Sequence, residues 1–131
     1  MEESKVVLRL CGEGTYEASM PSGTLRVGMH ALKPMELILT ALAGCSGVDV
    51  ENILRKKRQN VEDITIEVKG IRGKEHPRTY VRINLLFKVK GQVDKRALEH
   101  AIKLSVEKFC SVYAMLKNSV PIEVEYEICQ P

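Results

Sequence analysis

Hydrophobic and polar positions alternate with a period of two in several segments of this chain, which predicts β-strands. The clearest segments are Asp63 to Gly70 and Thr79 to Lys90, where every second residue is aliphatic or aromatic. Four shorter strands are expected at Val6 to Leu10, Thr15 to Met20, Thr24 to Met29 and Ile122 to Ile128. Turn residues separate the first three strands, which predicts a small meander at the start of the chain.

Two other segments have the pattern of helices. The first runs from Lys33 to Arg58 and opens with Pro34, whose missing N–H suits the first helical turn. Apolar residues occupy nearly every side from Leu37 to Leu42, so this helix is expected to be buried. The second runs from Asp94, a favourable N-cap, to about Asn118 with apolar residues at helical spacing. A break between Ser105 and Cys110 is compatible with the sequence but is not indicated by it.

The predicted order is βββ-α-ββ-α-β, and the strands are mostly connected as hairpins. This order predicts an α+β fold with an antiparallel sheet and a long central helix. A length of 131 residues is typical of a single domain, expected at 1–131. One small sheet and one further helix would leave part of the central helix uncovered. Burial alone therefore predicts a homodimer in which the two central helices are shared between chains.

Composition narrows the classes of function. The formal net charge is only +3, and the basic run Arg55 to Arg58 has no stacking aromatic residues beside it, so nucleic-acid binding is not favoured. The N-terminal residues lack a signal-peptide pattern, and the longest apolar stretch, Leu37 to Val48, is shorter than a membrane span. We therefore expect a soluble cytoplasmic protein with neither membrane nor nucleic acid as a partner.

The four cysteines carry the candidate chemistry. Cys11, Cys45, Cys110 and Cys129 form no CxxC pair, and the histidines add no ligand spacing, so the sequence predicts no metal site. Cys11 and Cys129 are interpreted as small buried hydrophobic residues near strand ends. Cys45 and Cys110 lie on the two predicted helices. They are either core residues or a peroxidatic and a resolving thiol, and the residues alone leave both interpretations open.

A resemblance to a known family favours the second interpretation. The segment from Lys33 to Cys45, KPMELILTALAGC, and the later segment Glu107-Lys-Phe-Cys110-Ser-Val resemble the OsmC/Ohr family of osmotically induced and organic hydroperoxide resistance proteins. The resemblance implies the fold derived above, as an intertwined homodimer. It also implies reduction of organic hydroperoxides by a dithiol reductant, without metal or cofactor. Cys45 is then the peroxidatic cysteine and Cys110 the resolving cysteine.

Two features depart from the peroxidases of that family. Their catalytic Glu directly follows the proline, whereas Met35 has that position here and the carboxylate is Glu36. Those peroxidases also carry an Arg that pairs with the Glu, for which Arg26 and Arg78 are the candidates here. The pattern is more similar to a less-studied OsmC-like subgroup. The alternative function is a non-catalytic module of the same fold that binds a small apolar ligand at the dimer interface.

Overall fold

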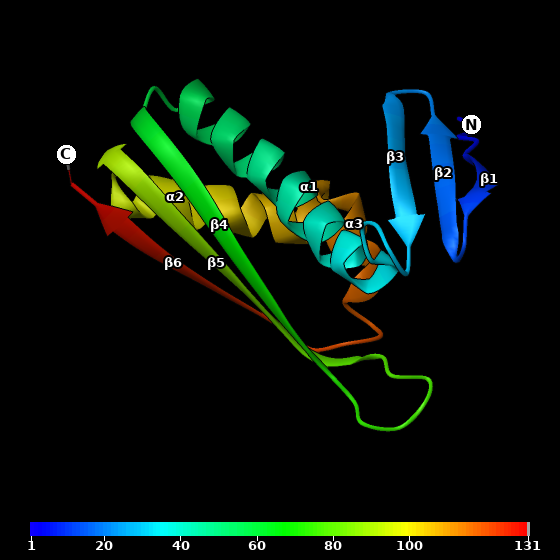
Figure 1. Cartoon of the computed structure of the whole chain (residues 1–131). Helices are drawn as coiled ribbons and strands as arrows, with labels where there is room; N and C mark the ends of the chain where they lie inside the picture. The colour runs from blue at the N-terminus through cyan, green and yellow to red at the C-terminus, as the bar shows by residue number, and fades with distance from the viewer. Residues whose placement is uncertain (131) are drawn as a thin grey trace. The chain divides into compact units, whose positions relative to one another are not determined.

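The computed structural model describes residues 1–130 and divides into two compact units, which we describe separately. The first unit comprises residues 1–38 and the second begins at Leu39, within the long helix α1 (Pro34–Lys56). Figure 1 labels the elements in chain order. The grouping of all 131 residues in a single domain stays a prediction.

The first unit contains an antiparallel three-stranded sheet. Its strands are β1 (Val7–Gly12), β2 (Thr15–Met20) and β3 (Gly23–Gly28), in the order β1-β2-β3. Gly28 has a φ of 141°, and a Cβ at this position would collide with the carbonyl oxygen of Gly14. Glycine is therefore required at Gly28 because no side chain fits there. The predicted meander is confirmed.

The second unit contains a second sheet, of the order β4-β5-β6. The long strands β4 (Asn60–Arg72) and β5 (Tyr80–Gln92) form an antiparallel hairpin, and β6 (Ile122–Cys129) pairs with β5 in parallel. The hairpin strands are therefore antiparallel, as predicted, and the β5–β6 edge adds one parallel pairing. A helical crossover connects β5 to β6, and such a crossover returns the chain in the same direction, as parallel pairing requires.

The core of the second unit lies between one face of this sheet and the helices. Alternate residues of β5 are fully buried, as a period of two requires: Ile83, Leu85, Phe87 and Val89. They share one hydrophobic cluster with residues of α1 and α2 (Lys95–Leu104), namely Leu42, Val50, Leu54, Ala97, Leu98, Ala101 and Ile102. The N-cap prediction is confirmed, because the Asp94 side chain accepts a hydrogen bond from the Arg96 N–H at 3.2 Å.

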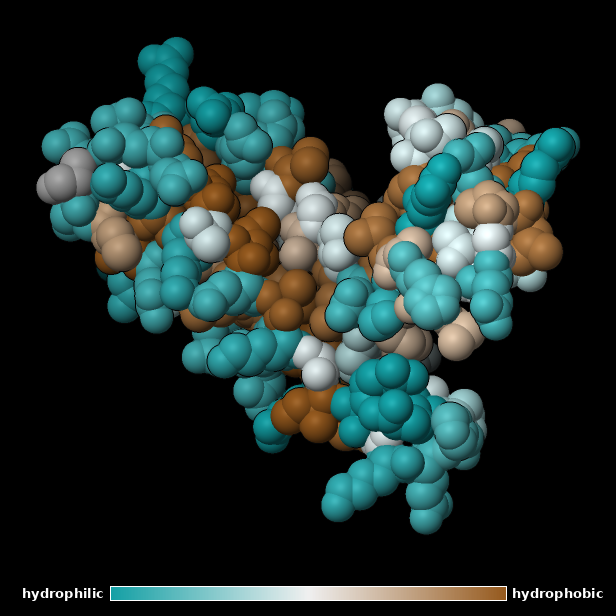
Figure 2. All heavy atoms as spheres, viewed as in Figure 1, coloured by the Kyte–Doolittle hydropathy of each residue, from teal (hydrophilic) through white to brown (hydrophobic). Residues whose placement is uncertain are grey.

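Helix α1 buries only a narrow stripe within one chain. The buried residues recur every fourth position, at Leu42, Ser46, Val50 and Leu54, while Val48 is 68% exposed. Figure 2 shows hydrophobic and weakly polar side chains along the part of α1 that faces the viewer. Part of α1 is therefore uncovered within one chain, as the sequence predicts for a single sheet and one further helix. Helix α1 is long and apolar enough to cross a membrane. The core helix of a soluble protein can have the same length and hydropathy.

The second predicted helix consists of three segments. Helix α2 is followed by a π-helical turn, η1 (Ser105–Phe109), and by the short helix α3 (Ser111–Leu116). Cys110 lies between η1 and α3 with extended backbone angles, φ −79° and ψ 102°. The break that the sequence left open therefore falls at the second candidate thiol.

Candidate functional site

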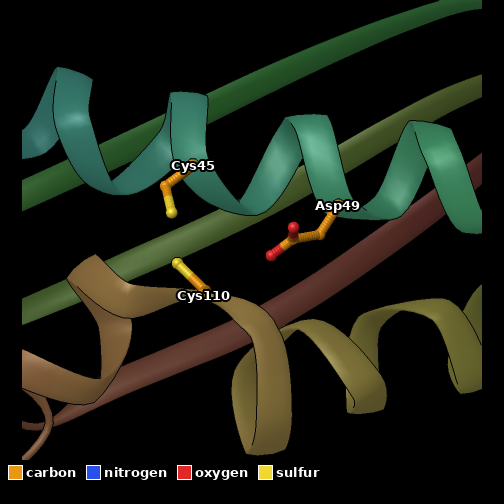
Figure 3. Close-up of side chains that lie close together, drawn as sticks. All are labelled: Cys45, Asp49 and Cys110. Carbon is orange, nitrogen blue, oxygen red and sulfur yellow. The ribbon is translucent and has the colours of Figure 1, made fainter. Parts of the chain in front are cut away.

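Three side chains from two distant parts of the second unit meet in one place. Cys45 and Asp49 are four residues apart on α1, a spacing that places both on the same face of the helix. Cys110 approaches from the junction of η1 and α3. The two sulfur atoms and an Asp49 carboxylate oxygen all lie within 4.8 Å of one another. Figure 3 shows the two thiols facing each other across the space between the segments, with the carboxylate beside them.

Two fully buried serines hold this arrangement by hydrogen bonds. The Ser46 hydroxyl donates to the sulfur of Cys110 at 3.3 Å, and the Ser105 hydroxyl donates to Oδ2 of Asp49 at 3.0 Å. Each serine therefore connects α1 to the α2–η1–α3 segment. The backbone N–H of Tyr113 also donates to the Cys110 sulfur at 3.3 Å, which makes Cys110 the N-cap of α3.

The environment of Cys110 favours the neutral thiol. Burial is the largest influence and raises the pKa of Cys110 above its ordinary value. Hydrogen bonds from Ser46 and from the Tyr113 N–H act in the opposite direction, whereas the neighbouring Cys45 thiol raises the pKa of Cys110 further. The net direction is upward, so Cys110 stays protonated at neutral pH until its proton is removed in a reaction.

The π-helical turn directs Cys110 toward α1. In η1 the Cys110 N–H donates to the carbonyl oxygen of Ser105, five residues earlier, at 2.7 Å. A π-turn contains one residue more than an α-helical turn and is frequently found at functional sites. The extra residue rotates the following chain by about 100° relative to a continuous α-helix. A straight helix through this segment would therefore point Cys110 elsewhere.

The structure does not add the other predicted site residues to this cluster. Arg78 lies in the loop between β4 and β5, is exposed, and donates through Nε to the carbonyl oxygen of Gly73 at 3.2 Å. Arg26 lies on β3 opposite Glu17, and Glu36 lies exposed in the first turn of α1. Arg26 and Glu36 belong to the first unit, so their approach to Cys45 stays a prediction.

The interpretation of Cys11 and Cys129 as buried residues was wrong. Both are exposed, Cys11 on β1 and Cys129 at the end of β6. At Cys129 the cause is visible in β6, where the burial pattern alternates and places the cysteine on the outward face. All four cysteines are free thiols.

Sequence reasoning missed Asp49, Ser46 and Ser105. Asp49 had one usable signal, because a carboxylate four residues after a candidate thiol on a predicted helix shares its face. Ser46 and Ser105 had none, since their roles depend on contacts between positions 56 and 64 residues apart in the sequence.

The arrangement offers three kinds of chemistry. Two neighbouring thiols can form a disulfide, a carboxylate beside a thiol can accept its proton, and two thiolates with a carboxylate can hold a soft metal ion. In the part of the chain that the structure describes, these three residues are the cluster of cysteine, histidine and carboxylate side chains that meets the distance requirement for a metal ion.

The two-sheet α+β fold with a thiol on its long helix and a second thiol on the crossover defines a class of thiol proteins. Residues 27–125 match the sequence model of the family described as OsmC-like protein. The chain therefore belongs to the OsmC-like family, and the predicted resemblance and fold are confirmed.

Individual relatives agree with this assignment. Protein YhfA of Escherichia coli K12 is 43% identical over 102 residues, which cover 77% of this chain and 76% of YhfA. The crystal structure of a hypothetical protein from Aquifex aeolicus VF5 superimposes with a TM-score of 0.97 at 44% identity, covering 100% of this chain and 99% of that one. The organic hydroperoxide resistance protein OhrB of Bacillus subtilis has a TM-score of 0.69 at 17% identity over 96% of this chain and 98% of OhrB. This last similarity shows a common fold.

Proposed function

We propose that this protein is a thiol-dependent reductase of organic hydroperoxides, with Cys45 as the peroxidatic cysteine and Cys110 as the resolving cysteine. The single observation that carries the proposal is the meeting of these two thiols, from two separate segments, within 4.8 Å. The structural similarity to organic hydroperoxide resistance proteins, such as OhrB of Bacillus subtilis, supports the same chemistry.

The proposed reaction has three steps. The Cys45 thiolate attacks the O–O bond of the hydroperoxide, so that Cys45 becomes a sulfenic acid and the alkoxide takes up a proton to leave as the alcohol. The Cys110 thiol then condenses with the sulfenic acid, forming the Cys45–Cys110 disulfide and releasing water. A dithiol reductant exchanges with this disulfide, which restores both thiols and oxidises the reductant.

The geometry around Cys110 suits the second step. Formation of the S–S bond brings the sulfur atoms to about 2.05 Å, so part of the separation must close on oxidation. Cys110 has extended backbone angles between two short helical segments, so it can move without displacing a long helix. Cys45 lies in the middle of α1 and is half-buried, whereas Cys110 is only 3% exposed. This difference suits Cys45 for the first encounter with the hydroperoxide.

Proton transfer in this site involves Asp49. A carboxylate repels a nearby thiolate but can accept the proton of a neighbouring thiol. In our proposal the Asp49 carboxylate accepts the proton of the Cys45 thiol, and a cation stabilises the resulting Cys45 thiolate. The family resemblance assigns the cation to Arg26 or Arg78 and a further carboxylate to Glu36. Single substitutions of these three residues to alanine identify which of them changes the rate of Cys45 oxidation.

We further propose that the active form is a homodimer. Val48 is apolar and 68% exposed within one chain, on the helix that the sequence predicts to be buried. A second chain placed against this side of α1 would complete the burial that the sequence predicts. The site would then be located next to the subunit interface.

Peroxide consumption tests the proposed reaction directly. Purified protein is mixed with cumene hydroperoxide and a small dithiol, and loss of the hydroperoxide is followed. We expect catalytic turnover in the wild type and in the Cys11→Ser/Cys129→Ser variant, and no turnover in Cys45→Ser. Cys110→Ser should complete the first step and hold a Cys45 sulfenic acid that dimedone labels. Full turnover in Cys45→Ser, or none in the wild type, would falsify the proposal. Absence of turnover in the wild type would favour the alternative function, a non-catalytic module that binds a small apolar ligand.

A further inference from the structure

We propose that Cys45, Asp49 and Cys110 form a binding site for a thiophilic divalent cation of the zinc and cadmium class. The proposal uses the thiols of the proposed reductase but does not rest on that function. The spacing of the cysteines in the sequence does not indicate a metal site. The cluster arises because the fold brings Cys110 against the face of α1 that carries Cys45 and Asp49.

The positions of the three ligand atoms suit one ion. In a tetrahedral zinc site the sulfur atoms lie about 2.3 Å and the carboxylate oxygen about 2.1 Å from the metal, which separates the ligand atoms by roughly 3.6–3.8 Å. The two sulfur atoms and the Asp49 oxygen are already within 4.8 Å of one another. Side-chain rotation and a small movement at Cys110 are sufficient to bring the three ligand atoms to these separations. Water would complete the fourth position.

The neighbours of the three ligands are those that a metal site requires. The fully buried Ser105 hydroxyl donates to Oδ2 of Asp49, which restricts the orientation of the carboxylate. The fully buried Ser46 hydroxyl and the Tyr113 N–H both donate to the Cys110 sulfur, as they would to a bound thiolate. Donors of this kind orient ligands and strengthen metal binding in known sites.

The charges in the cluster favour a cation. The two thiolates and the carboxylate of an occupied site would repel one another in this partly buried space if no ion lay between them. A divalent cation between the three negative groups offsets this repulsion, so both thiols can lose their protons when it binds. On binding, the Cys45 and Cys110 thiols each lose a proton to the solvent, and no electron is transferred. The occupied site then has a net charge of −1.

Metal binding and the disulfide exclude each other. Each sulfur can either coordinate the ion as a thiolate or be joined to the other sulfur. The reduced protein therefore binds the cation, and the oxidised protein does not. An occupied site would also protect Cys45 from oxidation, so the cation would act as a reversible inhibitor of the proposed reductase.

Cadmium provides a direct probe, because sulfur-to-cadmium charge transfer absorbs in the ultraviolet. The Cys11→Ser/Cys129→Ser protein, which lacks the two exposed thiols, is reduced with a phosphine, desalted without oxygen and titrated with Cd²⁺. We expect one ion per chain and a loss of most of the absorption in Cys45→Ser and in Cys110→Ser. Asp49→Asn should weaken binding tenfold or more. Glu51→Gln removes a carboxylate of the same helix that pairs with Arg55, and should change binding less than twofold.

Two measurements do not depend on the folding of a cysteine variant. Binding of Zn²⁺ to the reduced parent protein should release about two protons per ion, and prior formation of the disulfide should abolish binding. Release of fewer than one proton, equal binding by the oxidised protein, or equal affinity of the Asp49→Asn and Glu51→Gln variants overturns the proposal. Hydroperoxide turnover without cation binding would contradict only the proposed metal site. Cation binding without turnover would contradict only the proposed reductase activity.

Discussion

The hydroxyl of Ser46 on α1 donates a hydrogen bond at 3.3 Å to the sulfur of Cys110, which lies 64 residues later in the chain. Ser46 is directly next to Cys45 in the sequence, so the same turn of α1 supplies one thiol and contacts the other. This hydrogen bond lowers the pKa of Cys110 against the larger opposite effect of burial. Ser46 therefore helps to set the reactivity of the second thiol.

Substitution of Ser46 by alanine tests this relationship. Loss of a hydrogen bond worth about 1 kcal/mol should make the Cys110 thiolate roughly fivefold less populated at a given pH. The rate of Cys110 alkylation is measured in a protein that lacks the other three cysteines, and should fall by that factor in Ser46→Ala. Ser119→Ala is the control, because Ser119 is exposed. Equal rates in the two variants would show that the hydrogen bond does not influence Cys110.

The rate of alkylation should differ between the two thiols of the site. Cys110 has a raised pKa and is 3% exposed, whereas Cys45 is half-buried. At neutral pH we expect iodoacetamide to modify Cys45 before Cys110, and the Cys110 rate to continue to increase above pH 9, the ordinary value for a thiol. Mass spectrometry of the Cys11→Ser/Cys129→Ser protein gives both rates. Faster modification of Cys110 at neutral pH would contradict the structure.

The same raised pKa has a consequence for stability. The folded state holds Cys110 as the neutral thiol more strongly than the unfolded state does, so the unfolded state loses its proton first as pH rises. The free energy of unfolding should therefore decrease as pH rises above about 9, the ordinary thiol value. Urea unfolding at several pH values measures this decrease. It should be smaller in Cys110→Ala, and an equal slope in both proteins would rule out the effect.

Ser105→Ala should destabilise the protein by about 1.5–3 kcal/mol. The Ser105 hydroxyl is fully buried and donates to the charged Asp49 carboxylate, and hydrogen bonds to charged groups contribute about this much. Urea unfolding at pH 7 gives the value. The exposed Ser119→Ala control should change stability by less than about 0.5 kcal/mol. A Ser105→Ala value as small as the control would show that solvent replaces this hydrogen bond.

Deletion of Glu107 tests the role of the π-helical turn. Removal of one residue from Ser105–Phe109 lets the turn become α-helical and rotates Cys110 by about 100° away from Cys45. Formation of the Cys45–Cys110 disulfide by a mild oxidant should slow at least tenfold. Glu107→Ala keeps the turn length and serves as the control, because Glu107 is exposed. Circular dichroism establishes that the shortened protein is folded, and an unchanged disulfide rate in it would contradict the argument.

Val48→Glu tests the proposed homodimer. A charge placed on an apolar interface must be desolvated without a partner, so the variant should dissociate at a concentration at least tenfold higher than the wild type. Sedimentation velocity measures the dissociation. Asn118→Glu introduces the same charge at another exposed position and should leave the assembly unchanged. A wild type that sediments as a monomer, or a Val48→Glu variant with the wild-type profile, would contradict the dimer.

The sequence by itself determined the elements and the two thiols. Alternation along β4 and β5, the proline and apolar run of α1, and the Asp94 cap depend on neighbours in the chain, so they could be predicted from the pattern. The positions of Cys45 and Cys110 within a family motif indicated their pairing. Tertiary structure decided the rest: the parallel pairing of β6, the π-turn before Cys110, and the contacts of Ser46, Ser105 and Asp49. The π-turn is local, but the helical spacing of apolar residues continues through it, so the pattern does not show the extra residue. The strand pairing and the side-chain contacts arise between residues far apart in the sequence, where local periodicity carries no information about direction, distance or partner.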